Sequence, residues 1–291
     1  QQNYLVMFEQ VTVIGPGLLG SSLVLAIQER GLAKKVVIWA RSEKTAEKTR
    51  KKLPVDRVEQ DLENSVQGSD FVVICTPVET IAAILKKIAP IAEDDSIVTD
   101  VGSVKALICQ EAKNLFKSIS ASFIGSHPMA GSEKSGMENA DPNLFINRSC
   151  IITPLASEGE LGTDKLLNFW TELGMVAYRL GPKEHDQKMA LFSHLPHLVS
   201  SILSHSISSH AEDARQLSGQ GLRDTVRISG GDPNLWTGIL SENKNNLLES
   251  LDKFEESLKL ARSILTGQQR QSLCSFLEEA AQFKKSLKGY E

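Results

Sequence analysis

The fold is decided by the stretch Val11-Thr12-Val13-Ile14-Gly15-Pro16-Gly17-Leu18-Leu19-Gly20, in which an apolar run ends in glycines and a helical pattern follows. The glycines have the G-x-G-x-x-G spacing of a strand-to-helix turn that binds a dinucleotide. The first would make the tight turn, the second would let the backbone approach a pyrophosphate, and the third would let a helix pack closely on the sheet. A purely structural turn is the alternative. The expected cofactor contacts are Gly15, Gly17, Leu18, Leu19 and Gly20.

Further apolar runs predict the rest of the sheet. Strands are expected at Val11–Ile14, Val36–Trp39, Phe71–Cys75, Ile97–Thr99, Phe123–Gly125, Cys150–Thr153 and Val176–Arg179. Because helical patterns fill most gaps, the chain is predicted to be an α/β protein with a Rossmann-like, mostly parallel sheet. After Gly181 the strand signals stop, and a long helix is expected over 184–210. We expect a dinucleotide-binding domain over residues 7–181 and an all-helical domain over 182–291.

Composition and charge narrow the class of protein. The chain has 291 residues, 41% of them hydrophobic, and a net charge of −4, which predicts no nucleic-acid partner and no attraction to an anionic membrane. It has no apolar run of the roughly 18 residues that span a bilayer, so we expect a cytoplasmic protein. Four scattered cysteines indicate buried, reduced thiols. Six histidines without a cluster of acids or cysteines predict no metal site.

The end of the second predicted strand favours NADP as the cofactor, with NAD possible. An acid about 20 residues beyond Gly20 would bind the ribose 2′-hydroxyl of NAD, but this position is Ala40. Arg41 and Ser42 follow, and a guanidinium suits a 2′-phosphate. The alternative is that Arg41 is a solvated surface charge and that either cofactor is accepted.

Polar residues also follow the third, fourth and fifth predicted strands, where ligands bind in open α/β sheets. Thr76 and Pro77 are expected to contact the cofactor. Ser103 is expected near the chemistry, and it is equally suited to cap a helix starting near Val104. His127 is placed in a glycine-flanked loop over 126–136, where a substrate would meet the cofactor.

Five motifs in this order resemble the prephenate and arogenate dehydrogenase family of tyrosine biosynthesis. They are GPGLLG at 15–20, DVGSVK at 100–105, SHPMAGSEKSG at 126–136, SHLPH at 193–197 and DTVRISGGDPNLW at 224–236. The resemblance implies an oxidative decarboxylation of prephenate to 4-hydroxyphenylpyruvate, or of arogenate to tyrosine. Hydride would leave the hydroxyl-bearing ring carbon for NAD(P)+, and the ring carboxylate would leave as CO2. The family also implies dimerisation through the helical region. We expect no appended regulatory domain, so that inhibition by tyrosine would act at the active site.

The resemblance also implies roles for single residues. His127 would be the base for the ring hydroxyl, helped by Ser103, and Arg227 would bind the substrate carboxylate. Ser132 and Glu133 would line the substrate site, with Glu133 able to pair with the arginine.

The same family places two residues of the helical region near the substrate side chain, His197 and Ser193. His197 favours prephenate, whose side chain is a keto acid. Pro196 should kink or locally open the long helix. Asp224 and Trp236 would surround the same pocket, or serve as a helix cap and a core aromatic.

Apolar stripes in the helical region predict a homodimer. They consist of Leu191, Leu195, Leu198, Ile202 and Ile207 in one helix and Leu247, Leu248, Leu251, Phe254, Leu258 and Leu260 in another. Packing of the two stripes within one subunit is the alternative. Two other functions remain open, a β-hydroxyacid-type dehydrogenase and a non-catalytic NADPH sensor.

Overall fold

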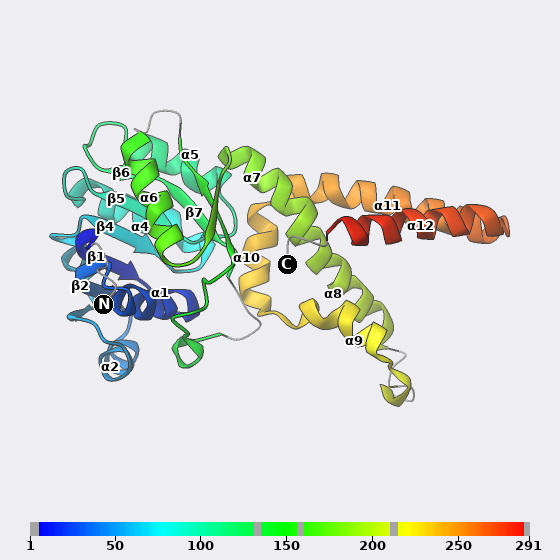
Figure 1. Cartoon of the computed structure of the whole chain (residues 1–291), viewed down its shortest axis with the longest axis horizontal. Helices are drawn as coiled ribbons and strands as arrows, with labels where there is room; N and C mark the ends of the chain where they lie inside the picture. The colour runs from blue at the N-terminus through cyan, green and yellow to red at the C-terminus, as the bar shows by residue number, and fades with distance from the viewer. Residues whose placement is uncertain (1–5, 131–134, 156–159, 210–214, 288–291) are drawn as a thin grey trace. The chain divides into compact units, whose positions relative to one another are not determined.

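The computed structural model describes residues 6–130, 135–155, 160–209 and 215–287. The chain forms two compact units, which divide between Lys244 and Asn245. The larger unit is built on a six-stranded sheet with strand order β3-β2-β1-β4-β5-β6, in which all neighbouring strands are parallel (Figure 1). These strands are β1 (Phe8–Ile14), β2 (Ala33–Trp39), β3 (Arg57–Glu59), β4 (Phe71–Ile74), β5 (Ile97–Asp100) and β6 (Ser122–Phe123). The predicted Rossmann-like sheet is therefore confirmed.

A second, three-stranded sheet follows in the chain. It consists of β7 (Gly125–Pro128), β8 (Ser149–Thr153) and β9 (Val176–Arg179), with β7 antiparallel and β9 parallel to the central β8. The prediction of one strand over Phe123–Gly125 is wrong. The parallel sheet ends with Phe123, and Gly125 already pairs with Thr153 in the second sheet.

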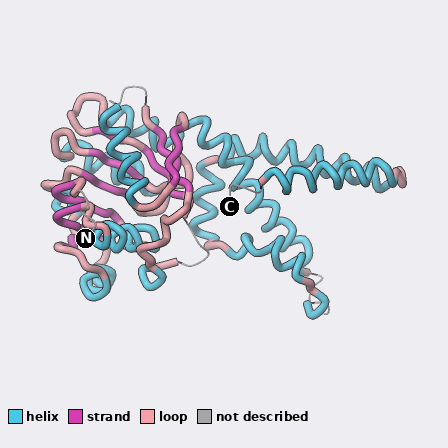
Figure 2. Tube along the Cα trace, in the orientation of Figure 1, coloured by secondary structure: helices cyan, strands magenta, loops and turns pink. Residues whose placement is uncertain are grey.

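Helices cover the sheets and make up the described chain after β9, a part that Figure 2 draws without strands. The α-helices are α1 (Leu18–Glu29), α2 (Glu43–Lys52), α3 (Leu62–Val66), α4 (Val78–Ile88), α5 (Ala106–Leu115), α6 (Glu160–Glu172), α7 (Pro182–Met189), α8 (Leu195–Ser208), α9 (Gln220–Val226), α10 (Pro233–Glu242), α11 (Lys244–Thr266) and α12 (Arg270–Ser286). Short 3₁₀ turns are η1 (Ala89–Ile91), η2 (Met137–Asn139), η4 (Arg215–Leu217) and η5 (Arg227–Gly230), and η3 (Ala190–His194) is a π-helical segment.

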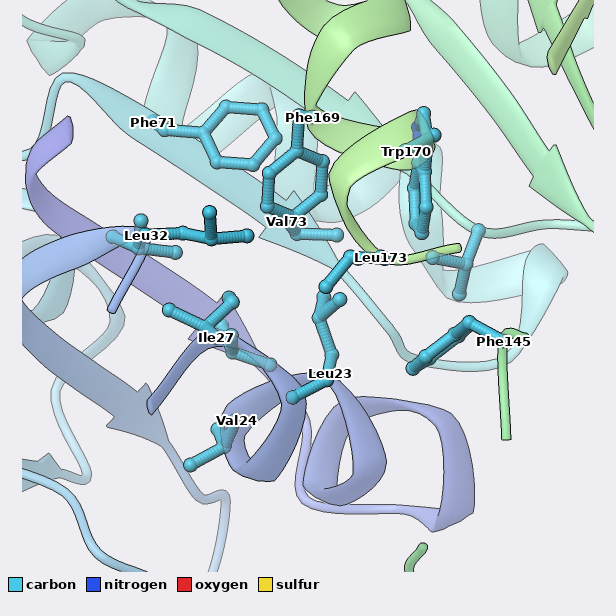
Figure 3. Close-up of a cluster of buried hydrophobic side chains, with 14 of the residues drawn as sticks. Leu23, Val24, Ile27, Leu32, Phe71, Val73, Phe145, Phe169, Trp170 and Leu173 are labelled. Atoms are coloured by element: carbon cyan, nitrogen blue, oxygen red, sulfur yellow. The ribbon is translucent and has the colours of Figure 1, made fainter. Parts of the chain in front are cut away.

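The strands are apolar on both faces because helices cover both sides of the parallel sheet. In β4, Phe71 and Val73 join one core cluster, and Val72 and Ile74 join the other. Figure 3 shows the first cluster, where residues of α1 such as Leu23 approach the side chains of β4 and α6. Helices α4 and α5 fill the second cluster. This two-sided burial fixes the carboxyl ends of β1, β4 and β5 along one edge.

The predicted long helix over 184–210 begins two residues earlier and is interrupted. Pro182 occupies the first turn of α7, a position where its missing N–H costs nothing. Before Pro196 the helix widens into η3, and the N–H of Leu195 bonds the carbonyl of Ala190, five residues back. The expected local opening at the proline is therefore confirmed, and it takes the form of a π-turn.

The smaller unit contains most of α11 and all of α12. Many of its large apolar side chains are exposed, namely Leu248, Leu258, Leu260, Leu265, Leu277 and Phe283. Cys274 is also exposed, so the expectation of a buried thiol is wrong at that position, whereas Cys109 and Cys150 are buried.

Candidate active site

The glycine turn after β1 has the geometry of a dinucleotide cradle. Gly15 has φ of +105°, a conformation that L side chains rarely adopt. A Cβ on Gly20 would overlap the carbonyl oxygen of Gly15, so α1 packs against the turn only because that atom is missing. A Cβ on Gly17 would meet no atom within 4 Å. The protein itself therefore does not require glycine at position 17, and the open space fits the close approach of a pyrophosphate.

The turn is completed by the end of β4. A Cβ on Gly15 would lie 2.9 Å from Cγ2 of Thr76, so these two predicted cofactor residues are brought together. Pro77 precedes α4 as its N-cap, and Leu18 and Leu19 open α1. Gly17 caps α1 without a side-chain hydrogen bond, which leaves the positive end of the helix dipole available to phosphates.

Arg41 and Ser42 lie where the sequence places them, directly beyond β2. Arg41 is exposed and forms no ion pair with a described residue. Ser42 caps α2 by accepting the N–H of Thr45 at 3.3 Å. The nearest acid, Glu43, bonds Arg50 at 2.8 Å, and this bond lowers the pKa of the Glu43 carboxyl. The carboxylate is thus engaged by α2, and Arg41 stays available to an anionic ligand.

His127 lies within strand β7, so its prediction as a loop residue is wrong. It pairs with Ile151 of β8, and its side chain is almost completely buried. Its Nδ1 lies 2.8 Å from Nε2 of His185 on α7, with the two rings edge to face. A rigid strand therefore positions this imidazole, and a helix supplies its partner.

His185 is in turn bonded to the residue after it in the chain. Its Nδ1 lies 2.8 Å from Oδ1 of Asp186. The same carboxylate accepts the backbone N–H groups of Lys105 and Ala106, both at 2.8 Å, and so caps the start of α5. Ser103 does not cap this helix, which corrects that alternative. Ser103 instead lies half-buried in the loop before α5. Asp186 bonds both the start of α5 and His185, and so connects the end of this loop to the two histidines.

A buried ion pair lies beside these histidines. The ammonium of Lys105, a fully buried side chain, bonds Oδ2 of Asp100 at the end of β5. Asp100 also accepts the backbone N–H of Gly102 at 2.8 Å and that of Ser126, the neighbour of His127, at 3.3 Å. The pair therefore ties the end of β5 to strand β7.

Burial keeps both histidines neutral. It lowers the pKa of His127 well below its usual value, and the positive charge of Lys105 and the nearby histidines act in the same direction. Burial also lowers the pKa of His185, although the hydrogen bond that His185 donates to Asp186 raises it in part. A neutral His127 is able to accept a proton at physiological pH.

A second group of aromatic rings lies on the helical part of the larger unit. The ring of His197 stacks on Trp236 at 3.6 Å between centroids. Nδ2 of Asn243 lies 3.0 Å from Nδ1 of His194 and donates to the backbone carbonyl of Asp186 at 2.8 Å. The buried atoms Nε2 of His194 and Nδ1 of His197 have no hydrogen-bond partner among the described residues.

Arg227 and Ser193 lie on elements that pack around His197. Arg227 is exposed at the start of η5, and η5 contacts α8, the helix that contains His197. Ser204 of α8 and Ser229 of η5 share a hydrogen bond of 2.8 Å between their hydroxyl oxygens, which holds the two segments together. Ser193 is half-buried in η3.

Three other predicted site residues have different outcomes. Asp224 lies inside α9 and accepts a bond from Gln220 at 2.7 Å, so its interpretation as a helix cap is wrong. Ser132 and Glu133 fall outside the described residues, and their roles stay predictions.

The sequence interpretation missed His185, Asp186, Lys105 and Asn243. The only signal available was an adjacent histidine and aspartate in a very polar helix, a pattern more typical of a solvated surface. Within the described ranges, no group of three or more His, Cys, Asp or Glu side chains is placed to bind a metal ion. No described helix is long and apolar enough to cross a membrane.

The chain matches two domain families. Residues 23–179 match the prephenate dehydrogenase nucleotide-binding domain, and residues 181–279 match the prephenate dehydrogenase dimerization domain. The chain is 29% identical over 289 residues to a cyclohexadienyl dehydrogenase of Zymomonas mobilis, covering 98% of each chain. It is 30% identical over 283 residues to a prephenate dehydrogenase of Lactococcus lactis, covering 96% of this chain and 77% of the relative.

Solved structures agree with these matches. The structure is similar to that of prephenate dehydrogenase from A. aeolicus in complex with hydroxyphenyl propionate and NAD+, with a TM-score of 0.88, 28% identity, and coverage of 96% and 98% of the two chains. It is also similar to Synechocystis arogenate dehydrogenase, with a TM-score of 0.82, 32% identity, and coverage of 95% and 99%. With both of its domains matched, the chain belongs to the prephenate dehydrogenase family of NAD(P)-dependent oxidoreductases.

Proposed function

We propose that the chain catalyses the oxidative decarboxylation of prephenate to 4-hydroxyphenylpyruvate and CO2, with NADP+ preferred over NAD+. The nicotinamide, when bound, supplies the hydride acceptor. The hydroxyl proton leaves with the C–H bond cleavage and returns to the same oxygen when the C–CO2 bond breaks and the ring becomes a phenol. The observation that carries the proposal is a neutral, buried His127 held by a strand and by His185.

In this reaction His127 accepts the hydroxyl proton and later gives it back. General bases work best when they are unprotonated at the working pH and fixed within reach of the proton. Burial provides the first condition and strand β7 the second. Ser103, in the loop between β5 and α5, would help to hold the hydroxyl group.

Arg227 would bind the substrate carboxylate through paired hydrogen bonds. His197 and Ser193 would lie beside the substrate side chain. Nδ1 of His197 is buried without a described partner, and a polar group of the substrate would remove the cost of that unmade bond. With its proton on that nitrogen, His197 would donate to the keto oxygen of prephenate; arogenate, which has an ammonium group there, is the alternative substrate.

The preference for NADP+ rests on Arg41 and Ser42 beyond β2. An exposed guanidinium without an ion partner is suited to a 2′-phosphate, which NAD+ lacks. The other acceptor contacts would come from the glycine turn, from Leu18 and Leu19, and from Thr76 and Pro77.

The decisive experiment measures turnover of prephenate and arogenate with each cofactor. We expect prephenate with NADP+ to give the highest kcat/KM. His127→Asn should lower kcat by about 10²–10⁴-fold, the usual contribution of a general base, while cofactor binding survives. His205→Asn, at an exposed position of α8, is the matched control and should keep wild-type activity. Wild-type turnover by the His127 variant would refute the assignment.

Two remote alternatives have less support. A 3-hydroxyisobutyrate dehydrogenase from Mycobacterium tuberculosis has a TM-score of 0.53 at 12% identity, which shows a shared fold alone. Such β-hydroxyacid enzymes typically use a lysine of a glycine-rich helix, and the sequence between residues 160 and 200 lacks that motif. A non-catalytic NADPH sensor would have no use for a positioned base, and the same assays would detect it as an inactive protein that binds cofactor.

Two domains with different roles would meet near Gly181. Residues 7–181 would bind the nucleotide, and residues 182–291 would bind the substrate and form the dimer. A homodimer would cover the exposed apolar side chains of α11 and α12, because patches of this kind usually mark interfaces. Analytical ultracentrifugation at micromolar concentration should show a species of twice the 31.9 kDa chain mass. A monomer at all concentrations would refute the dimer.

A further inference from the structure

Two histidines and a carboxylate form a buried chain of hydrogen bonds, and the proposed reaction uses only its first member. The chain runs from Nδ1 of His127 to Nε2 of His185 and from Nδ1 of His185 to Asp186, with both steps at 2.8 Å. His185 is fully buried, and Asp186 nearly so. The proton positions along the chain therefore decide what His127 presents to a substrate.

The direction of these bonds follows from the far end. A carboxylate accepts hydrogen bonds, and Asp186 already accepts two from the start of α5. Nδ1 of His185 must therefore donate to it. A neutral imidazole has one N–H, so Nε2 of His185 is an acceptor, and Nδ1 of His127 must carry the proton that it accepts. His127 is left with an unprotonated Nε2.

We propose that His185 and Asp186 fix the tautomer of His127 and form a two-histidine relay that takes over its proton. This inference rests on the proposed role of His127 as the base. When Nε2 of His127 takes the hydroxyl proton, the proton on Nδ1 moves to Nε2 of His185. The positive charge then lies next to the Asp186 carboxylate, and the shift reverses when the phenol oxygen is protonated.

The surrounding charges favour this transfer. The groups that face the relay are Lys105 with its partner Asp100, His194, and Asp186. Burial and Lys105 oppose a positive charge on both rings, and His194 adds to this at His127, whereas only His185 also has the hydrogen bond to Asp186 and the negative charges of Asp186 and Asp100 to favour one. A proton added to the pair is therefore better stabilised on the ring farther from the substrate.

The relay also joins the base to the helical segment after β9. Asp186 and His185 come from α7, and the backbone carbonyl of Asp186 is held by Asn243 at the end of α10. A shift of α7 at Asp186 would loosen both the bond to His185 and the cap of α5. His185 is thus a positioning residue for a base on the other side of the Gly181 junction.

Two substitutions separate orientation from proton transfer. In His185→Gln the side-chain amide can accept from His127 and donate to Asp186, but it cannot take a proton. His185→Leu removes both functions. We expect kcat to fall about 10-fold in the first variant and about 100-fold in the second, as for loss of groups that orient a functional histidine, with KM little changed. His205→Gln is the control and should leave kcat unchanged.

The tautomer is measured directly by ¹⁵N NMR of the full-length chain labelled at histidine. The wild type and His185→Gln should show His127 protonated at Nδ1 and not at Nε2, whereas His185→Leu should lose this preference. Circular dichroism and cofactor binding check that each variant folds. If the leucine variant does not fold, the kcat of the glutamine variant and the tautomer of the wild type still test the relay.

Protonation of His127 at Nε2, or wild-type kcat in both His185 variants, would overturn the relay. If the wild type turns over neither substrate, the proposed function fails, and the NMR measurement still decides the tautomer.

Discussion

Two alanine substitutions in the glycine turn should separate folding from cofactor binding. One should lower the Tm of the protein, and the other should lower its affinity for the cofactor. In Gly20→Ala the new Cβ would overlap the carbonyl oxygen of Gly15 and would also lie 3.2 Å from Cβ of Cys75. Backbone atoms cannot yield as a flexible side chain can, so α1 must move away from the sheet. Such overpacking costs about 1–3 kcal/mol. In a unit of this size we expect Tm to fall by about 2–4 °C for each kcal/mol.

Gly17→Ala is the matched control for this argument. Its Cβ meets no protein atom within 4 Å, and its backbone is extended, with φ of −74°, so the fold should keep its Tm. The methyl group would instead occupy the space into which a pyrophosphate fits. Cofactor affinity should fall about tenfold or more, or at least about 1.4 kcal/mol.

Differential scanning calorimetry without ligand, together with titration of NADP+ into each variant, separates the two effects. A Tm for Gly20→Ala equal to that of the wild type would show that the turn is looser than described. An equal loss of Tm in both variants would refute the distinction between a packing glycine and a ligand-facing glycine.

Three further outcomes are expected. Arg227→Ala should raise KM about 10–100-fold with a smaller change in kcat, because a hydrogen bond to a charged group contributes about 1.5–3 kcal/mol; an unchanged KM would mean that the carboxylate is bound elsewhere. Arg41→Ala should weaken NADP+ more than NAD+ in equilibrium titrations, and equal losses would contradict its role at the 2′-phosphate. Acid should destabilise the fold, because burial lowers the pKa of His194 from 6.5 to about 4. The stability that this neutral histidine maintains is complete above pH 6.5 and is lost as the pH falls towards 4, by roughly 3 kcal/mol. Urea unfolding at several pH values should show the loss and show less of it in His194→Gln.

The sheet was predictable because its strands carry their signal locally. The strand around Val11 and that around Val72 are continuous apolar runs, as expected for strands covered on both faces. Strand β3 has only three residues, two of them charged, and gives no such signal. The break after Phe123 was also hidden, because a change of sheet leaves the apolar pattern of the chain intact.

The candidate site likewise contains residues that the sequence identifies and residues that it does not. The glycine turn and His127 stand in motifs with a recognisable spacing, and the sequence identifies both. The partners of His127 do not, since α7 reads as a solvated helix of mostly polar residues. His185 is buried because α7 packs against α5 and β8, and Asn243 reaches Asp186 across 57 residues of chain. Such pairings are properties of tertiary packing, which spacing along the chain does not encode.

The π-turn before Pro196 sets the angular phase of everything that follows it on the same helix. Each residue of an α-helix advances by about 100° and about 1.5 Å, so one residue wound into a wider turn works as a local insertion. It allows Asp186 to face α5 while His197, farther along, faces Trp236. Because the inserted residue is absorbed in the turn, deleting the exposed Phe192 should restore a regular helix and leave His197 on Trp236, whereas closing the turn without a deletion would rotate His197 by roughly a quarter of a revolution. The wider turn, more than the identity of its residues, therefore keeps the two groups of histidines in register.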